Sequence, residues 1–160
     1  KEICKQEYIK RKNYILYVKN YEIVEKFSHD YLQIYFSKGL INNFNFEKIV
    51  FQRQLDGSMI IVLHCLYIKE LLDISMDQII KSLRIIFRDQ QKYLTLFSHA
   101  KLIDIMNWRA SQPLNNLLPI ELQWSSRNNI GFCGDWFDID SCVGAEAAMN
   151  SSIRLAKLLS

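Results

Sequence analysis

Three of the five glycines in the chain, Gly131, Gly134 and Gly144, lie within a stretch of fourteen residues. The first two end a short β-prone segment and are followed by Asp135, whereas Gly144 begins a helical segment rich in small residues. Glycine lets backbone N–H groups approach a ligand closely. The positive end of the helix dipole favours a ligand that carries negative charge. A carboxylate just after the strand can accept hydrogen bonds from hydroxyl groups. This spacing favours a site for an anionic ligand that carries sugar or polyol hydroxyls.

The same glycines have a second explanation that needs no ligand. A glycine turn followed by a close contact between a helix and a strand would also require small residues at these positions. The sequence leaves both explanations open.

Other residues could line a ligand pocket. His64 lies in an apolar, β-prone segment, and Trp108 and Arg109 end another. An indole offers a flat apolar wall, and a guanidinium can pair with a phosphate or a carboxylate. Trp136 and Phe137 directly follow the aspartate of the glycine cluster. Each of these side chains also fits an ordinary packing or surface role.

Hydrolase and metal chemistry find little support in the sequence. There is no G-x-S-x-G motif for a serine nucleophile, and only three histidines could act as a base. The four cysteines form no CxxC pair and have no histidine at ligand spacing, so we expect no metal site. No secretory signal precedes them, and a reduced, cytoplasmic location is the expectation.

Composition narrows the possible partners further. Six basic and two acidic residues give residues 1–20 a local charge of +4, whereas the whole chain carries +3. We therefore expect no nucleic-acid partner. With 49% apolar residues the chain should be globular, and no apolar run is long enough for a membrane span.

The periodicity of apolar residues predicts an α+β fold. Ser75 and Gln78 form a capping-box pattern ahead of a helix expected over residues 76–89, and Asp56-Gly57 indicates a hairpin turn. A second helix is expected from about residue 142, with Ala145, Ala148, Ser152 and Leu155 on its packing face. Strands are expected at 14–19, 46–54, 59–67, 102–110, 121–126 and 129–133. The whole indicates one antiparallel sheet with a helix, followed by a short strand-turn-helix element.

The glycine cluster resembles a known flavin site. Gly-Phe-Cys-Gly-Asp-Trp-Phe at 131–137 and Val-Gly-Ala-Glu-Ala-Ala-Met-Asn-Ser-Ser at 143–152 resemble the C-terminal flavin-binding segment of renalase-like FAD-dependent oxidoreductases. These enzymes belong to the flavin-containing amine oxidase superfamily. Their Trp-Arg dipeptide on an upstream strand is matched within residues 107–113.

The resemblance implies roles for individual residues. The carboxylate of Asp135 would contact the ribityl or pyrophosphate part of FAD. Backbone N–H groups at the start of the last helix would face the pyrimidine edge of the flavin. The cofactor-binding residues implied in this way are Gly134, Asp135, Trp136, Val143, Gly144 and Ala145. The substrate pocket would include His64, Trp108, Arg109 and Phe137, and no catalytic acid or base is implied.

The resemblance also implies how the chain is organised. Residues 1–126 would form a substrate-binding domain, and residues 127–160 would supply the last strand, turn and helix of a Rossmann-like FAD-binding domain. The GxGxxG motif of such a domain does not occur in these 160 residues, so we expect a separate N-terminal half to carry it. The expected activity is hydride transfer to flavin from a small substrate, such as a nicotinamide or an amine, and this fragment alone would be inactive. The alternative is a non-catalytic α+β binding module without a cofactor.

Overall fold

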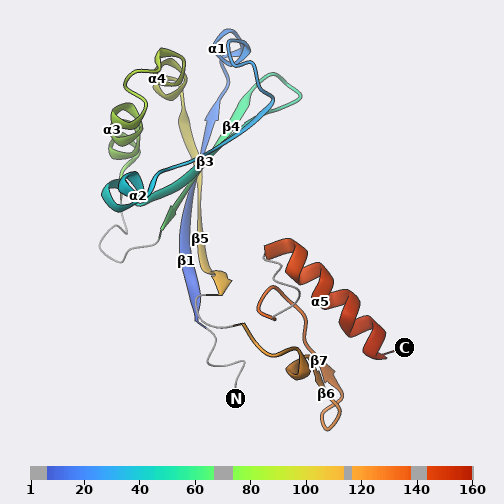
Figure 1. Cartoon of the computed structure of the whole chain (residues 1–160). Coiled ribbons are helices and arrows are strands. Elements are labelled where there is room, and N and C mark those ends of the chain that lie inside the picture. The colour runs from blue at the N-terminus through green and yellow to red at the C-terminus, as the bar shows by residue number, and fades with distance from the viewer. Residues whose placement is uncertain (1–6, 67–73, 114–116, 138–143, 160) are drawn as a thin grey trace. The chain divides into compact units, whose positions relative to one another are not determined.

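A computed structural model of the chain describes residues 7–66, 74–113, 117–137 and 144–159 (Figure 1). The fold is α+β, as expected from the sequence. It divides into two compact units, one of Arg11–Trp108 and one of Lys1–Lys10 together with Arg109–Ser160. No helix in the described residues is long and apolar enough to cross a membrane.

The larger unit is built on an antiparallel sheet with the strand order β2-β3-β4-β1-β5. Its strands are β1 (Tyr8–Val18), β2 (Tyr31–Tyr35), β3 (Phe46–Arg53), β4 (Met59–Leu66) and β5 (Lys101–Pro113). Its helices are α1 (Tyr21–Glu25), α2 (Lys38–Phe44), α3 (Met76–Ile86) and α4 (Gln91–Ser98). The strands expected at 46–54 and 59–67 are confirmed as β3 and β4, apart from Tyr67, which lies outside the described residues.

The Asp-Gly turn between β3 and β4 is confirmed. The Asp56 carboxylate accepts hydrogen bonds from the backbone N–H and the hydroxyl of Ser58, and Gly57 has a φ of 77°. Such a positive φ strains any residue with a Cβ. The turn sets the antiparallel register in which Phe51 pairs with Ile61.

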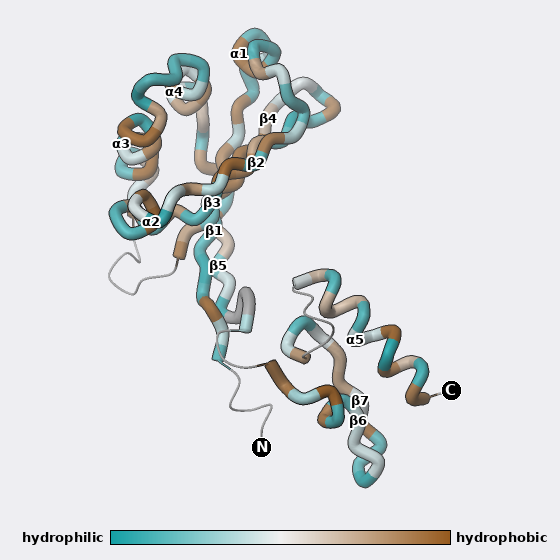
Figure 2. Tube along the Cα trace, in the orientation of Figure 1, coloured by the Kyte–Doolittle hydropathy of each residue, from teal (hydrophilic) through white to brown (hydrophobic). Residues whose placement is uncertain are grey.

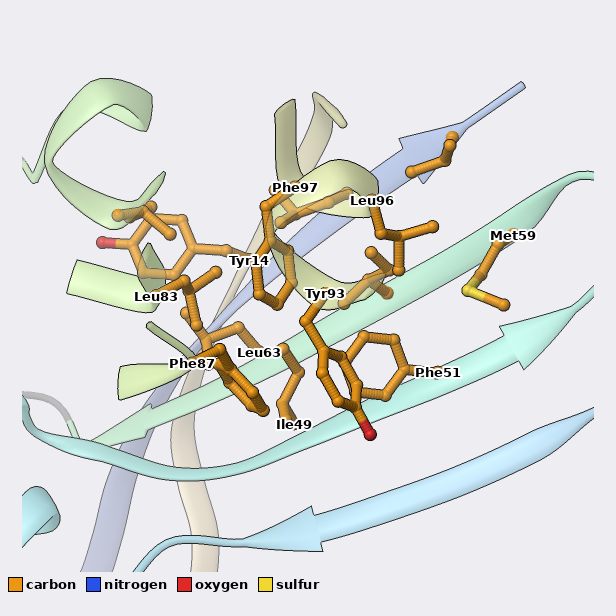
Figure 3. Packing of buried hydrophobic residues seen from close by; sticks show 14 of the residues in the cluster. Tyr14, Ile49, Phe51, Met59, Leu63, Leu83, Phe87, Tyr93, Leu96 and Phe97 are labelled. Atoms are coloured by element: carbon orange, nitrogen blue, oxygen red, sulfur yellow. The ribbon is translucent and has the colours of Figure 1, made fainter. Parts of the chain in front are cut away.

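The core of this unit lies between one face of the sheet and helices α3 and α4 (Figure 3). Alternate residues of β4 are buried, as one covered face requires: Met59, Ile61, Leu63 and Cys65. Aromatic side chains fill the layer, and the rings of Phe87 and Tyr93 have centroids 4.6 Å apart. The burial of these apolar side chains drives the folding of this unit.

The capping box at the start of α3 is confirmed, but the helix ends earlier than expected. Ser75 Oγ accepts from the backbone N–H of Gln78 at 3.3 Å, and Gln78 Oε1 accepts from the backbone N–H of Ser75 at 2.8 Å. The helix ends at Ile86 rather than near residue 89, and the chain turns into α4. This second helix packs Tyr93, Leu96 and Phe97 against the same sheet face, which a single straight helix could not cover.

The smaller unit contains a 3-10 helix η3 (Ile120–Gln123), β6 (Trp124–Ser125), β7 (Ile130–Gly131) and helix α5 (Gly144–Leu159). Strands β6 and β7 pair antiparallel, with Trp124 opposite Gly131. The strand expected at 121–126 is wrong for most of its length, because η3 turns the buried Gln123 side chain toward α5. The strand expected at 129–133 is reduced to two residues.

The expected packing face of the terminal helix is partly wrong. Ala147 and Ser151 are buried, with Ala148 and Leu155 half-buried beside them, whereas Ala145 and Ser152 are exposed. The buried stripe is therefore rotated by about one residue from the prediction. Because small residues occur on both sides of α5, their spacing alone did not define the packed side.

Candidate functional site

Close packing explains the first glycine of the cluster. A Cβ added to Gly131 would lie 2.8 Å from Leu155 Cδ1, so the Leu155 side chain of α5 would have to move to admit a side chain at this position of β7. Gly131 therefore serves the contact between strand and helix, which is the explanation that needs no ligand.

A buried polar network fixes the next glycine against α5. The backbone N–H of Gly134 donates to Ser151 Oγ at 3.1 Å, and Gln123 Nε2 donates to the same oxygen at 3.0 Å. Gln123 Nε2 also donates to the backbone carbonyl of Ser151, and both side chains are fully buried. The Gly-Asp turn is thus held about two helical turns from the start of α5.

Sequence reasoning missed both polar members of this network. Ser151 stands next to the expected packing residue Ser152, and Gln123 falls in the segment expected to be a strand. Their hydrogen bond joins residues 28 positions apart. Gln123 belongs to no motif, and Ser151 lies in the segment 143–152 without a role assigned to it there.

Within the described residues, the turn leaves one carboxylate without a hydrogen-bonding partner. Gly134 has a φ of 154°, and a Cβ there would lie 2.8 Å from Trp136 Nε1. The Asp135 side chain makes no hydrogen bond or ion pair with the described residues. Its charge nevertheless acts on Tyr8, whose pKa is raised first by burial and second by this carboxylate. Asp135 is therefore free to accept hydrogen bonds from a ligand.

Trp136 and Phe137 anchor the far side of the turn. The backbone N–H of Leu118 donates to the carbonyl of Trp136 at 2.7 Å, and Phe137 is fully buried in a small apolar cluster with Leu118. The ring of Trp136 meets Tyr8 edge to face, with centroids 6.4 Å apart. Its Nε1 is buried without a hydrogen-bond acceptor among the described residues, although a buried indole N–H usually has one.

Helix α5 begins at a glycine, Gly144, that has a positive φ and no close neighbours among the described residues. Gly144 has a φ of 62°, and no described atom lies within 4 Å of the place where a Cβ would stand. Its glycine is thus required by backbone conformation rather than by crowding. The exposed Ala145 follows, and Val143 lies outside the described residues. The first N–H groups of this sixteen-residue helix lack partners within the helix and carry the positive end of its dipole.

The other predicted pocket residues lie on two strands. His64 is half-buried on β4, opposite Asn13 on β1 and Lys48 on β3. Trp108, with 44% of its surface exposed, and the exposed Arg109 are neighbours on β5. His64 and Trp108 belong to the larger unit, and the Gly-Asp turn belongs to the smaller one. The structure thus brings Gly134, Asp135 and Trp136 together with α5 in the smaller unit, to which Arg109 also belongs, and places His64 and Trp108 in the other unit.

Comparison with protein-family models, curated proteins and solved structures finds no match to this chain. The assignment of a function therefore depends on the residues and their geometry.

The Ser151 network leads to a prediction about stability. Replacing Ser151 with alanine leaves the Gly134 N–H without its acceptor, so we expect a loss of about 1–3 kcal/mol in the free energy of unfolding. Urea denaturation followed by circular dichroism would measure it. Ser152→Ala is the matched control, because this exposed hydroxyl donates only to the Ala148 carbonyl of its own helix. Equal denaturation midpoints for the two variants would contradict the role assigned to Ser151.

His64 leads to a prediction about pH. Burial and the positive charge of Lys48 lower its pKa from the usual 6.5, with a smaller opposing effect from Glu47. The unfolded chain therefore binds the proton more readily than the folded one, so protonation favours unfolding. We expect stability to be full above pH 6.5 and to decline as the pH falls from there toward the lowered pKa.

Unfolding free energies measured between about pH 7 and pH 5 would test this prediction. His64→Gln removes the titrating group and should flatten the decline. His29→Gln changes an exposed histidine before β2. This variant should lose stability at low pH as the native chain does, because His64 is still present. The same slope in both variants would assign the decline to other groups.

Proposed function

We propose that this chain is the C-terminal portion of an FAD-dependent oxidoreductase of the renalase-like type. The observation that carries the proposal is the Gly134–Asp135 turn, which is fastened to α5 through Ser151 and whose carboxylate has no hydrogen-bond partner among the described residues of the same unit. In this interpretation, β7 and α5 are the last strand and helix of a Rossmann-like FAD-binding domain. The rest of that domain, with its GxGxxG motif, comes from a separate N-terminal half.

The residues present fit a flavin dinucleotide chemically. Asp135 can accept hydrogen bonds from ribityl hydroxyls, and the backbone of Gly134 can approach a phosphate closely. The backbone N–H groups of Val143, Gly144 and Ala145 would lie at the pyrimidine edge of the ring. The unsatisfied indole N–H of Trp136 is a further donor in the same turn. These are the residues that would hold the cofactor.

The proposed chemistry divides between the cofactor and the chain. FAD, when bound, supplies a flavin ring that accepts a hydride from the substrate. The positive end of α5 would stabilise negative charge on the reduced ring. His64, neutral at physiological pH because its pKa is lowered, would help to orient a small substrate such as a nicotinamide or an amine. Trp108, in the same unit as His64, would offer the substrate an apolar surface.

The second candidate is a non-catalytic α+β binding module. It is favoured by Gly131 and Gly134, because added Cβ atoms at both would collide with side chains of this same chain. Packing alone would then account for two of the three clustered glycines. The carboxylate of Asp135, which has no hydrogen-bond partner among the described residues, weighs against this candidate, since packing does not explain it.

Purification of the full-length gene product that contains this segment would test the proposal. We expect the yellow colour and visible absorbance of bound flavin, and bleaching of that absorbance when a reducing substrate is added. A full-length protein that stays colourless after incubation with FAD and gel filtration would favour the non-catalytic module.

A further inference from the structure

A basic groove is lined by residues of helices α3 and α4, whose places in the larger unit are seen in Figure 1, and by none of the residues assigned to the flavin site. It consists of two adjoining hollows of about 400 and 300 Å³, which share Arg84 and Ser98. All of its lining residues belong to the larger unit. Hollows of this volume are in the range that small organic ligands occupy.

Positive charge is concentrated around this groove. Lys81 and Arg84 lie one helical turn apart on α3, and Arg88 lies in the turn that follows the helix. Five basic and two acidic residues give the segment 76–101 a net charge of +3, equal to that of the whole chain. The loop that joins α3 to α4 is hydrophilic (Figure 2). The groove therefore attracts anions more strongly than the average surface of the chain.

The cations are available to a ligand. Arg84 has no ion pair or hydrogen bond with any described residue. Arg88 Nε lies 3.4 Å from the Asp89 carboxylate, but both side chains are largely exposed, which makes this pair weak. Both arginines line the larger hollow, and two guanidinium groups there can bind the oxygens of a phosphate group through several charged hydrogen bonds.

The two hollows differ in chemistry. The larger one is lined by the two arginines, Gln91, Thr95, Ser98 and one apolar residue, Leu94. The smaller one is lined by Met76, Ile80, Phe97 and Ala100 together with Asp77, Lys81 and the shared Arg84 and Ser98. A ligand that spans both can place an anionic group beside the arginines and an apolar group beside Ile80 and Ala100.

We propose that the α3–α4 groove binds a phosphate monoester that carries an apolar organic group. The phosphate lies between Arg84 and Arg88, and the organic group covers Ile80 and Ala100 in the smaller hollow. Carboxylates are weaker candidates, because a single carboxylate offers two oxygens to donors that can serve three. The site is independent of the proposed flavin chemistry.

Isothermal titration of the purified chain with phenyl phosphate and with inorganic phosphate tests the proposal. We expect saturable binding of phenyl phosphate in the range up to about 10 mM, at least several-fold tighter than that of inorganic phosphate. Arg84→Gln should weaken binding of phenyl phosphate about tenfold or more. Arg127→Gln is the matched control, since it removes one exposed guanidinium from the smaller unit and should leave the affinity unchanged.

Two results would overturn the proposal. One is the absence of saturable binding, or equal affinity in Arg84→Gln and the native chain, which would make the cations an ordinary solvated surface. The other is equal affinity for inorganic phosphate and phenyl phosphate, which would remove the role of the smaller hollow.

The source of the phosphate monoester can be identified in the same series. Phosphatidic acid also carries a phosphate monoester, so sedimentation with phosphatidylcholine vesicles that contain it would reveal a lipid ligand. Binding to these vesicles that is lost in Arg84→Gln would support the site and identify a lipid headgroup. Binding of phenyl phosphate without binding to vesicles would support the site and identify a free small molecule.

Discussion

Replacing Asp135 with alanine in the full-length protein is expected to weaken FAD binding about tenfold or more. The carboxylate is the one charged side chain of the Gly-Asp turn, and it has no hydrogen-bonding partner among the described residues, so its hydrogen-bonding capacity is available to the cofactor. Hydrogen bonds to charged groups contribute about 1.5–3 kcal/mol each, and each 1.4 kcal/mol changes the affinity tenfold. The ratio of flavin absorbance to protein absorbance after gel filtration would measure the loss.

Glu121→Ala is the control for this experiment. It removes a carboxylate of the same charge from η3, on the exposed surface of the same unit. We expect its flavin content to match that of the native protein. An Asp135→Ala protein with undiminished flavin would refute the role assigned to the carboxylate. Loss of flavin in both variants would point instead to a general weakening of the smaller unit.

The elements that could be predicted from the sequence are those fixed by local signals. Asp56-Gly57 determines a hairpin through the side-chain and backbone requirements of four residues, and Ser75 and Gln78 cap a helix within a single turn. Elements fixed by distant partners were missed or misplaced. Strand β1 was expected from residue 14 but begins at Tyr8, and its pairing with β4 already reaches Arg11, opposite Leu66.

The residues of the candidate site also divide into those marked by local sequence signals and those that depend on distant partners. The glycines and Asp135 were found because a strand, a turn and a helix start follow one another within fourteen residues. Ser151 and Gln123 were not found, because their hydrogen bonds exist only after α5 has packed against η3. A buried polar residue is identified by its partners, and partners distant in the sequence cannot be recognised from composition or spacing. The packing of Phe51 likewise depends on rings that are distant in the sequence, so its contribution to stability is seen only in the folded structure.

Phe51→Ala is expected to destabilise the larger unit by about 3–5 kcal/mol, the usual cost of removing a phenyl ring from a packed core. The side chain is fully buried in the middle of β3. Its ring contacts Phe27, Tyr93 and Phe97, with centroid separations of 5.4, 5.4 and 6.2 Å. The substitution would therefore leave a cavity where the sheet meets α4, and rigid neighbouring rings would not collapse to fill it (Figure 3).

Chemical denaturation monitored by near-ultraviolet circular dichroism would measure this loss, because the signal arises from the packed aromatic rings. Tyr35→Ala is the matched control: it also removes a ring from the sheet, but 70% of this residue is exposed and we expect a change below about 1 kcal/mol. Since whole domains are stable by only about 5–15 kcal/mol, Phe51→Ala should leave little folded margin. If both variants lost the same small amount, the aromatic layer between the sheet and α4 would not be the main source of stability in this unit.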